Sequence, residues 1–460
     1  MLPAATGQRP RRGRSTRDSI RQPSPRRAAT QVRYTARVMA GERTRDTDVA
    51  IVGGGIAGAS AALHLALHGR RVTVLERGEI ASGASGVNAG MIDSTGWGHA
   101  PDLQAHLTAG SLDLFKEMAL DHGEDIELRQ SGSLQAIHTA AQHDFARDRV
   151  AGLRARGHVI ELLGIRDARS LEPALSPALL GAVYSPLRSQ ADPERATRAF
   201  ARVAERNGAR VLTHSEVTAI TPRQAGGWVV RTTRAEVVAE HLVIAAGAWC
   251  GPIGAMLGLD IPIVPVRGQM WATAPLAPRV FQTISSAESG LAWRDDRGGA
   301  LSSRARREDE PPDLTHRDGA RVTRHLYGRQ RRNGEVIFGG DRQLAGWGTA
   351  TEPSGIEVNH AHAAEILPFL QTQPAARTWA GLMPFSLDGK PLIGRVPARD
   401  GLWIVSGLAS SGFGRGPMAG KLLADALHTG TPAPVLAEAD PARGIREAMV
   451  SRGAASSPAR

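Results

Sequence analysis

Cysteine is almost absent from this chain of 460 residues, because Cys250 is the only one. A single thiol cannot form a disulfide within the chain, and a cysteine-rich zinc site needs several thiols. We therefore predict no metal site. A single cysteine suits a reducing compartment, so we expect a cytoplasmic protein, with peripheral contact at the inner membrane face left open.

Lysine is scarce as well, with three residues in the whole chain, whereas arginine is abundant. The formal net charge of +11 is concentrated at the start, since residues 1–38 contain ten arginines and one acid and so carry +9. Subtracting +9 from +11 leaves only +2 for residues 39–460. A nearly neutral body argues against a broad basic face, and we expect no stable nucleic-acid partner.

The first 38 residues are rich in Arg, Ser and Pro and poor in large apolar residues. Such a composition cannot bury enough apolar surface to fold, so we predict a disordered basic tail over residues 1–46. Three alternatives stay open for this tail: a translation start at Met39, an organelle transit peptide, and contact with nucleic acid. Residues 431–460 are predicted to be a C-terminal tail.

No stretch is long and apolar enough to be read as a membrane span. Residues 49–69 and 242–266 are the strongest candidates, but the first contains His64, His68 and a glycine cluster, and the second contains Asp260 and three prolines. A span needs about 20 predominantly apolar residues. Each stretch therefore reads better as a buried strand, a turn and a helix.

A strand–helix–strand unit stands near the start of the body. Residues 48–52, DVAIV, form a short apolar run that is typical of a parallel strand covered on both faces. Apolar residues recur at helical spacing from Ile56 to His68, and RVTVLE from Arg71 is a second strand. Glycines occupy the turn from strand to helix, as in a dinucleotide-binding βαβ unit.

The glycines of that turn have separate physical roles. Gly53 allows the tight turn, Gly55 lets backbone approach a pyrophosphate, and Gly58 lets the helix pack on the strand. The helix N-terminus offers unpaired N–H groups to the phosphates. Glu76 ends the second strand, where a carboxylate accepts hydrogen bonds from the ribose hydroxyls and repels a 2′-phosphate. The unit therefore predicts NAD or FAD rather than NADP.

A second glycine loop favours FAD. Residues 406–420, SGLASSGFGRGPMAG, again follow a strand and open a helix, but no ribose-binding acid follows them. One NAD needs one such turn, whereas FAD is extended and its isoalloxazine ring lies far from the pyrophosphate. A helix N-terminus beside the ring would stabilise negative charge on its reduced form.

Other stretches have the pattern of antiparallel strands. Residues 265–273 and 326–340 are the clearest, and Asn333-Gly334 is predicted to be a two-residue hairpin turn. Residues 294–325 between them are highly charged and lack a regular pattern. We predict that they form an insertion, with a mobile lid as the alternative.

Five segments together resemble one known family, the FAD-dependent D-amino-acid oxidase-like oxidoreductases, which include glycine oxidases, sarcosine oxidases and D-amino-acid dehydrogenases. The segments are IVGGGIAGASAALHLALHGRRVTVLERG, ASGASGVNAGMI, ADPERATRAFARVAERNGARV, VIAAGAWC and the pair WAGLMPFSLDGKPLIG and GLWIVSGLASSGFGRGPMAGKLLAD. The likeness covers about residues 47–430. The order and spacing of the segments make it specific.

The resemblance implies an α/β fold, α+β overall, in which a Rossmann-like FAD-binding domain is interleaved with an antiparallel-sheet substrate domain. The whole oxidoreductase domain would span residues 47–430. Its FAD-binding parts are predicted at about residues 47–95, 170–255 and 376–430, and its substrate-domain parts at about residues 96–169 and 256–375.

The resemblance also assigns site residues. It implies that Glu76 binds the adenosine ribose, that the backbone of Val217 reaches the adenine, and that Trp249 lies beside the cofactor. The predicted cofactor-binding residues are Gly53, Gly55, Ile56, Ala57, Gly58, Glu76, Arg77, Ser82, Ser85, Gly86, Asn88, Ala89, Gly90, Val217, Gly247, Trp249, Ser410, Ser411, Gly412 and Phe413. Some relatives tether flavin through a histidine that residues 83–90 lack, or use a cysteine that residues 380–388 lack, so FAD is predicted to be bound non-covalently.

A substrate clamp is predicted in the strand before the hairpin turn. Alternation puts Tyr327, Arg329 and Arg331 on one face, and a two-residue turn puts Arg331 opposite Val336. An arginine among apolar neighbours needs an anion. The resemblance implies that this anion is the substrate carboxylate bound by Arg331, with Arg329 as the next candidate; a structural carboxylate is the alternative. The predicted catalytic residues are therefore Arg331, Arg329 and Tyr327.

The function that the resemblance implies is oxidation of the C–N bond of a small amino acid or secondary amine. Hydride passes to FAD, and the resulting imine hydrolyses to an oxo acid. Oxygen or a quinone would accept the electrons. Two other classes stay open: an NAD-linked dehydrogenase, and an FAD-dependent tRNA-modifying oxidoreductase, which the basic tail suggests.

Overall fold

The structure is a computed structural model that describes residues 43–93, 101–288, 316–317, 320–321 and 326–448. Most of the predicted N-terminal tail, most of the charged segment 294–325 and the end of the C-terminal tail lie outside the described residues, so the predictions made for them stay predictions. Thr44–Arg460 form one compact unit, and the description below concerns that unit.

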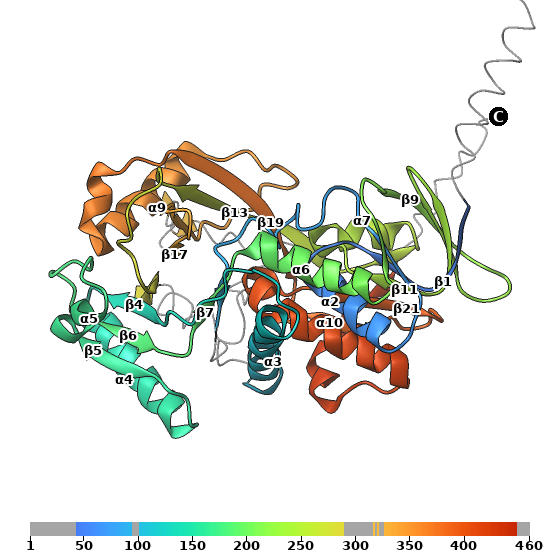
Figure 1. Cartoon of the computed structure of the whole chain (residues 1–460), viewed down its shortest axis with the longest axis horizontal. Helices are drawn as coiled ribbons and strands as arrows, with labels where there is room; N and C mark the ends of the chain where they lie inside the picture. The colour runs from blue at the N-terminus through green and yellow to red at the C-terminus, as the bar shows by residue number, and fades with distance from the viewer. Residues whose placement is uncertain (1–42, 94–100, 289–315, 318–319, 322–325, 449–460) are drawn as a thin grey trace, which may run out of the picture. The chain divides into compact units, whose positions relative to one another are not determined.

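The first sheet has eight strands and a parallel centre. Its order is β20-β21-β11-β1-β2-β8, with β10 pairing on β11 and β9 on β10. The strands are β1 (Arg43–Val52), β2 (Val72–Leu75), β8 (Arg210–Leu212), β9 (Val217–Pro222), β10 (Trp228–Thr232), β11 (Glu236–Ile244), β20 (Leu392–Arg395) and β21 (Leu402–Ser406). Figure 1 shows β1, β11 and β21 side by side. The predicted strand–helix–strand unit is confirmed by the parallel pairing of β1 with β2.

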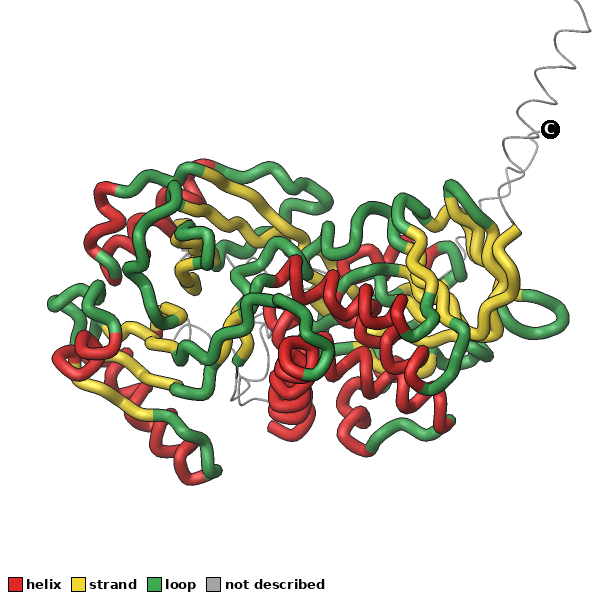
Figure 2. The backbone as a smooth tube through the Cα atoms, in the orientation of Figure 1, coloured by secondary structure: helices red, strands yellow, loops and turns green. Residues whose placement is uncertain are grey.

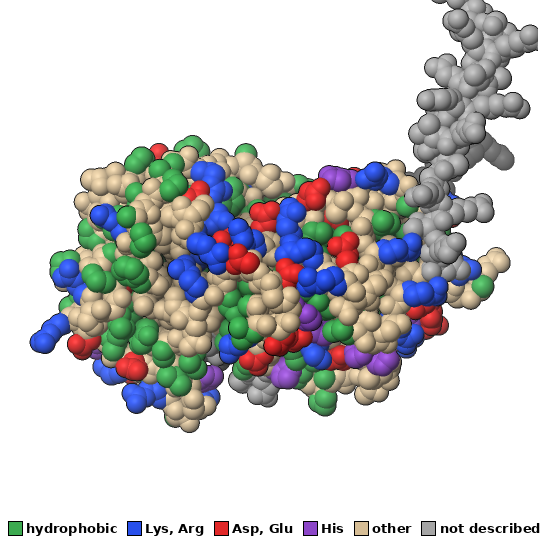
Figure 3. Space-filling model, in the orientation of Figure 1, with side chains coloured by type: hydrophobic (Ala, Val, Ile, Leu, Met, Phe, Trp, Pro, Cys, Tyr) green, Lys and Arg blue, Asp and Glu red, His purple; other side chains and the backbone are tan. Residues whose placement is uncertain are grey.

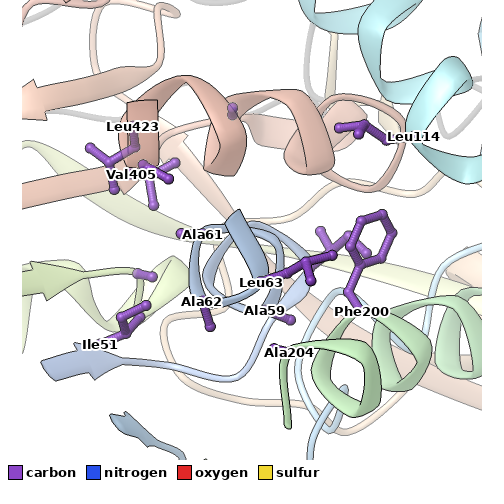
Figure 4. Close-up of a cluster of buried hydrophobic side chains, with 14 of the residues drawn as sticks. Ile51, Ala59, Ala61, Ala62, Leu63, Leu114, Phe200, Ala204, Val405 and Leu423 are labelled. Carbon is purple, nitrogen blue, oxygen red and sulfur yellow. The ribbon is translucent and has the colours of Figure 1, made fainter. Parts of the chain in front are cut away.

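Helices cover one face of this sheet. They are α2 (Ile56–Leu67), α3 (Pro101–Leu120), α6 (Pro193–Arg206) and α10 (Gly412–Thr429). Figure 4 shows α2 between α10 and α6, with Ala59, Ala61 and Ala62 at its surface. These small side chains let the three helices approach closely, and the larger Leu63 and Phe200 fill the space between α2 and α6. The opposite face is covered by β9, β10 and α7 (Cys250–Ala255).

The second sheet also has eight strands and is mostly antiparallel, in the order β19-β13-β18-β17-β14-β4-β6-β5. The strands are β4 (Ser133–Ile137), β5 (Glu161–Gly164), β6 (Gly181–Ser185), β13 (Ile263–Ala272), β14 (Thr283–Ser286), β17 (Tyr327–Gln330), β18 (Val336–Gly339) and β19 (Arg377–Ser386). Within the described residues, β14 and β4 are the one parallel pair of this sheet. Figure 2 draws both sheets in yellow. The expected combination of a Rossmann-like sheet with an antiparallel sheet is confirmed.

The second sheet packs on α9 (Pro353–Ile366) and α5 (Ile165–Leu171), and α4 (Ala140–Ala155) lies on β5 and β6. Trp271, Phe338 and Ile366 are among its fully buried side chains. The remaining elements are β3 (Met91–Ile92) with β7 (Ser189–Gln190), β12 (Leu259–Asp260) with β22 (Arg446–Glu447), β15 (His316–Arg317) with β16 (Ala320–Arg321), and the 3₁₀ turns η1 (Gly247–Trp249), η2 (Pro368–Thr372), η3 (Ala409–Ser411), η4 (Pro434–Ala439) and η5 (Pro441–Arg443).

The hairpin between β17 and β18 differs from the prediction. Gln330, not Arg331, is the partner of Val336. The N–H of Arg331 donates to the carbonyl of Glu335 at 2.8 Å, so the loop has three residues and ends on Gly334 at φ +90°. A three-residue loop with a glycine in the left-handed region is a common hairpin turn. The predicted two-residue turn was therefore wrong, and every cross-strand partner shifts by one residue.

The predicted domain ranges stay a prediction. Strands β6 and β19 fall within the ranges assigned to the FAD-binding parts, yet both pair within the second sheet. Residues 434–447 fall within the predicted C-terminal tail, but they form η4, η5 and β22. Leu436 and Ile445 in this stretch are 3% and 6% exposed, so apolar burial holds it on the body.

Candidate active site

The glycine turn after β1 is tight enough to require glycine. Gly53 has φ +113°, and a Cβ there would lie 2.4 Å from the carbonyl oxygen of Ala245. A Cβ on Gly58 would lie 2.2 Å from the carbonyl oxygen of Gly53. Either contact would force backbone apart. The turn therefore brings β1, α2 and the end of β11 into close backbone contact.

Glu76 follows β2 and is 9% exposed. The N–H of Gly54 donates to its Oε2 at 2.7 Å, and the N–H of Gly78 donates to its Oε1 at 2.8 Å. An ionised carboxylate has about four acceptor positions, so one bond to each oxygen leaves room for two hydroxyl donors. Ser85 adds a further contact to the turn, because its Oγ accepts from the N–H of Ile56 at the start of α2, at 3.0 Å.

One cavity runs from this turn to the second sheet. The predicted site residues that line it are Gly53, Gly55, Ile56, Ala57, Glu76, Arg77, Ser82, Ser85, Asn88, Val217, Gly247, Trp249, Tyr327, Ser410, Gly412 and Phe413. They come from segments spread over most of the chain. The sequence motifs thus meet around a single elongated space, as a dinucleotide with a distant second ring system requires.

Some predicted residues lie behind the lining. Gly58, Gly86, Ala89, Gly90 and Ser411 are not among the residues that line the cavity. Two of these glycines allow close backbone packing. A Cβ on Gly86 would lie 2.2 Å from the carbonyl oxygen of Ala81, and a Cβ on Gly90 would lie 1.9 Å from the carbonyl oxygen of Ala191. These positions fold the loop that carries Ser82, Ser85 and Asn88.

The second sheet supplies lining residues that the sequence reasoning missed. They are Gly268, Met270, Gly381, Leu382, Met383 and Pro384, from β13 and β19. Gly381 to Pro384 lie in the segment WAGLMPFSLDGKPLIG that carried the resemblance, but no site role was assigned to them, because which strand face meets the cavity depends on how β13 and β19 pair. Within this group no side chain is charged, and Tyr327 of β17 is the ionisable residue that the second sheet adds to the described lining. Burial raises the pKa of Tyr327 despite the opposing effect of Arg342, so the phenol is neutral at physiological pH.

The two predicted clamp arginines are not in the cavity lining. Arg331 Nη2 donates to Asp192 Oδ2 at 2.7 Å, and its Nη1 donates to Glu335 Oε2 at 3.0 Å. Arg329 is 1% exposed and donates to the carbonyls of Ala89 and Ala191 and to the side chain of Gln190. Arg331 thus has two carboxylate partners within the protein, and the clamp role of Arg331 and of Arg329 stays a prediction.

Arg342 is a buried arginine that the sequence reasoning did not select. It is 3% exposed, and its Nη2 donates to the Oγ of Ser410 at 3.0 Å. Burial lowers the pKa of Arg342 to about 10, which leaves the guanidinium protonated at neutral pH. Its position after β18 carried no signal in a single sequence, because Ser410 is 68 residues away.

One group of the described residues has donor atoms spaced as metal ligands are. One ligand atom each of His138, His362 and Glu365 lies within 4.8 Å of the others. None of the three lines the cavity. The absence of a metal site thus stays a prediction.

Charges of both signs are mixed on the face drawn in Figure 3. Among the exposed ion pairs of the described residues, Asp125 pairs with Arg195 at 3.0 Å and with Arg332 at 2.9 Å. Such pairing offsets the positive charge of the two arginines. Among the residues that the structure describes, no helix combines the length and the hydropathy that a bilayer crossing needs.

The residues present fit FAD on three grounds. The glycine turn has no Cβ where phosphates would approach, Glu76 keeps acceptor positions that ribose hydroxyls could use, and the cavity lining includes both Trp249 and Met270 of the second sheet. None of the described lining residues is a histidine or a cysteine.

Comparisons with known proteins agree with this geometry. A family model described as FAD dependent oxidoreductase matches residues 48–426. Glycine oxidase of Geobacillus kaustophilus (strain HTA426) is 29% identical over 388 residues, covering 83% of this chain and 93% of that protein. The crystal structure of glycine oxidase from Geobacillus kaustophilus is similar with a TM-score of 0.73 and 26% identity, covering 86% of this chain and 98% of that one. The crystal structure of iminodiacetate oxidase from Chelativorans sp. BNC1 is similar with a TM-score of 0.70 and 25% identity, covering 85% of this chain and 98% of that one. The resemblance seen in the sequence is thereby confirmed, and the chain belongs to the family of FAD dependent oxidoreductases.

Proposed function

We propose that the chain oxidises the C–N bond of a small amino acid or secondary amine to an imine, which water then hydrolyses to an oxo acid. The observation that supports this most is the single cavity that joins the dinucleotide turn at Gly53 to Tyr327 and Met270 of the second sheet. Bound FAD supplies the hydride acceptor. The names of the similar proteins, glycine oxidase and iminodiacetate oxidase, support a substrate of this class.

The residues of the chain have two tasks in this proposal. The glycine turn, Glu76 and Ser85 hold the dinucleotide, whereas Met270, Leu382 and Met383 give the far end an apolar wall that excludes water. The lining residues from the second sheet offer no general base, because the phenol of Tyr327 stays protonated. No general base is required if the substrate binds as the free amine, and we propose that it does.

The proposed function is tested by anaerobic mixing of the purified flavoprotein with glycine, sarcosine, proline and D-amino acids. We expect at least one of them to bleach the flavin absorbance, and kcat/KM for that substrate to rise with pH up to the pKa of its amine. If none bleaches a flavin that dithionite reduces fully, the proposed substrate class is wrong.

FAD is proposed to be non-covalent, because no histidine or cysteine is among the described lining residues. Acid precipitation should then release all of the flavin into the supernatant. The electron acceptor, oxygen or a quinone, is distinguished by measuring hydrogen peroxide in air-saturated buffer and dye reduction without oxygen. A cytoplasmic location, with or without peripheral membrane contact, is part of the same proposal and is tested by fractionating cells.

A further inference from the structure

A short loop after β18 connects the second sheet to the cofactor cavity. Arg267 of β13 exchanges two backbone hydrogen bonds with Gln343, at 2.8 and 2.9 Å, and its Nη1 donates to the carbonyl of Ala350 at 2.6 Å. One residue of a strand therefore holds both ends of the loop. We call residues 343–350 the strap.

The tip of the strap carries a tryptophan. The N–H of Gly348 donates to the carbonyl of Ala345 at 3.1 Å, and Gly346 has φ +56°, so the chain reverses within four residues. Trp347 lies in this turn and is 47% exposed. The anchored ends and the tight turn restrict the positions that its side chain can occupy.

Trp347 packs on a residue that lines the cavity. Its ring is stacked on the ring of Trp249, with the centroids 5.3 Å apart and an interplanar angle of 27°. The guanidinium of Arg77 lies over the Trp249 ring as well, with its Cζ 3.6 Å from the centroid. Trp249 and Arg77 line the cavity, whereas Trp347 is not among the described lining residues. Trp347 therefore contacts Trp249 from outside the cavity.

The stack lies beside the part of the cavity that would hold the ribose of FAD. Arg77 directly follows Glu76, whose carboxylate has acceptor positions that ribose hydroxyls could use. Arg77 is also exposed, so the cavity reaches the protein surface at this edge. A dinucleotide that enters or leaves through this edge must pass Arg77 and Trp249.

We propose that the strap retains FAD: Trp347 holds Trp249 and Arg77 at the edge of the cavity and thereby slows release of the cofactor. Trp347 is thus a positioning residue that acts through Trp249. The inference rests on the binding of FAD and is independent of the substrate. It goes beyond the proposed function, because it assigns control of cofactor release to a loop of the second sheet.

The physical basis is the stacking of the two indole rings. A stacked aromatic pair changes an equilibrium by about 2- to 10-fold beyond the burial of its area. This contact must break before Trp249 can swing away from the cavity, so its contribution should appear in the rate of release. Because Arg267 fixes both ends of the strap, little conformational freedom is lost when Trp347 stacks.

The test compares Trp347→Ala and Trp347→Phe with wild type in the FAD-loaded protein. Release of FAD is followed by the rise in flavin fluorescence after dilution. We expect Trp347→Ala to raise the dissociation rate constant of FAD about 3- to 10-fold. Trp347→Phe keeps an aromatic ring and should stay within about twofold of wild type. An unchanged rate of release in Trp347→Ala overturns the inference.

A second background tests whether Trp347 acts through Trp249. If it does, the contribution of Trp347 disappears once Trp249 is absent. We therefore expect Trp347→Ala to change the rate of FAD release by less than about twofold when it is added to Trp249→Ala. The full effect of Trp347→Ala in that background would mean that Trp347 acts by another route, and this would overturn the inference.

Leu344→Ala is the matched control. Leu344 belongs to the same strap and is 39% exposed, but it is not a member of the stack, so this variant should release FAD at the wild-type rate. Equal acceleration in Leu344→Ala and Trp347→Ala would point to general loosening of the strap and overturn the inference. If Trp347→Ala does not fold with FAD, Trp347→Leu replaces it with the same expectation, because leucine keeps apolar bulk without a ring. None of these measurements requires turnover, so the inference is tested even if the proposed substrate class is wrong.

Discussion

Glu76 combines two roles in one carboxylate, because it accepts backbone N–H groups from both Gly54 and Gly78 while lining the cavity. Replacing it with Ala would remove the proposed acceptor for the ribose hydroxyls and the acceptor of the two N–H groups in the glycine turn. We expect Glu76→Ala to weaken FAD binding by about 1.5–3 kcal/mol per lost charge-assisted hydrogen bond at most. Titration of the apoprotein with FAD measures this. An unchanged dissociation constant would remove Glu76 from the cofactor site.

His64 on α2 should make the protein less stable in acid. Burial lowers the pKa of His64 to about 4, partly offset by its hydrogen bond to the carbonyl of Ser60 at 2.8 Å. The unfolded chain has the ordinary pKa near 6.5, so between pH 6.5 and 4 the unfolded state binds the additional proton. Stability contributed by neutral His64 is therefore complete above pH 6.5 and falls as the pH drops toward 4.

We expect this effect to reach up to about 3 kcal/mol at pH 4. Urea unfolding of wild type and of His64→Gln across this range should give a steeper pH dependence for wild type. The exposed His106 provides the control, since His106→Gln should keep the wild-type slope. Parallel curves for wild type and His64→Gln would contradict the prediction.

At the scale of elements, the contact between α2 and α10 depends on glycine. A Cβ on Gly420 would lie 2.3 Å from the carbonyl oxygen of Ala57 and 2.8 Å from the N–H of Ala61. These are backbone atoms that cannot move aside. We expect Gly420→Ala to cost about 1–3 kcal/mol of unfolding free energy.

Gly152 is the matched control, because it lies in α4 and a Cβ there would meet nothing within 4 Å. Gly152→Ala should raise the unfolding free energy by up to about 1 kcal/mol through helix propensity. Urea denaturation of both variants measures the difference. A Gly420→Ala protein as stable as wild type would mean that the two helices can move apart freely.

The hairpin and the start of α6 are also coupled. Asp192 caps α6 by accepting from the N–H of Arg195 at 2.9 Å, and Arg331 pairs with the same carboxylate. We expect Arg331→Met to lower the unfolding free energy by about 1–3 kcal/mol, because Asp192 is 2% exposed and would lose its cation. The sequence-based clamp predicts instead a loss of about 30- to several-thousand-fold in kcat/KM for amino acids. Measuring both quantities in one variant separates the two roles.

For the whole molecule, the prediction concerns the basic tail. The first strand begins at Arg43, so a protein that starts at Met39 keeps every described element. We expect this shortened protein to retain its flavin, its melting temperature and its turnover. Flavin content and calorimetry test the expectation. Loss of flavin or of solubility would show that residues 1–38 contribute to the body.

The sequence alone determined the parts of the protein that depend on neighbours in the chain. The turn at Gly53, helix α2 and the carboxylate of Glu76 follow one another within a single βαβ unit, so glycine spacing and apolar periodicity were sufficient to predict them. The second loop at Ser410 was predicted in the same way, because it also joins a strand directly to a helix.

Only the tertiary structure decided which side chains meet across the second sheet. The three-residue hairpin loop shifts the cross-strand partners of β17 by one residue from the predicted register. Arg331, beside that loop, forms an ion pair with Asp192. Arg342 and Ser410 are 68 residues apart, and their contact exists because the segment after β18 meets the N-terminal end of α10. Side-chain partners at such separations follow from strand register and packing, and these depend on the sum of many weak long-range contacts rather than on any local pattern.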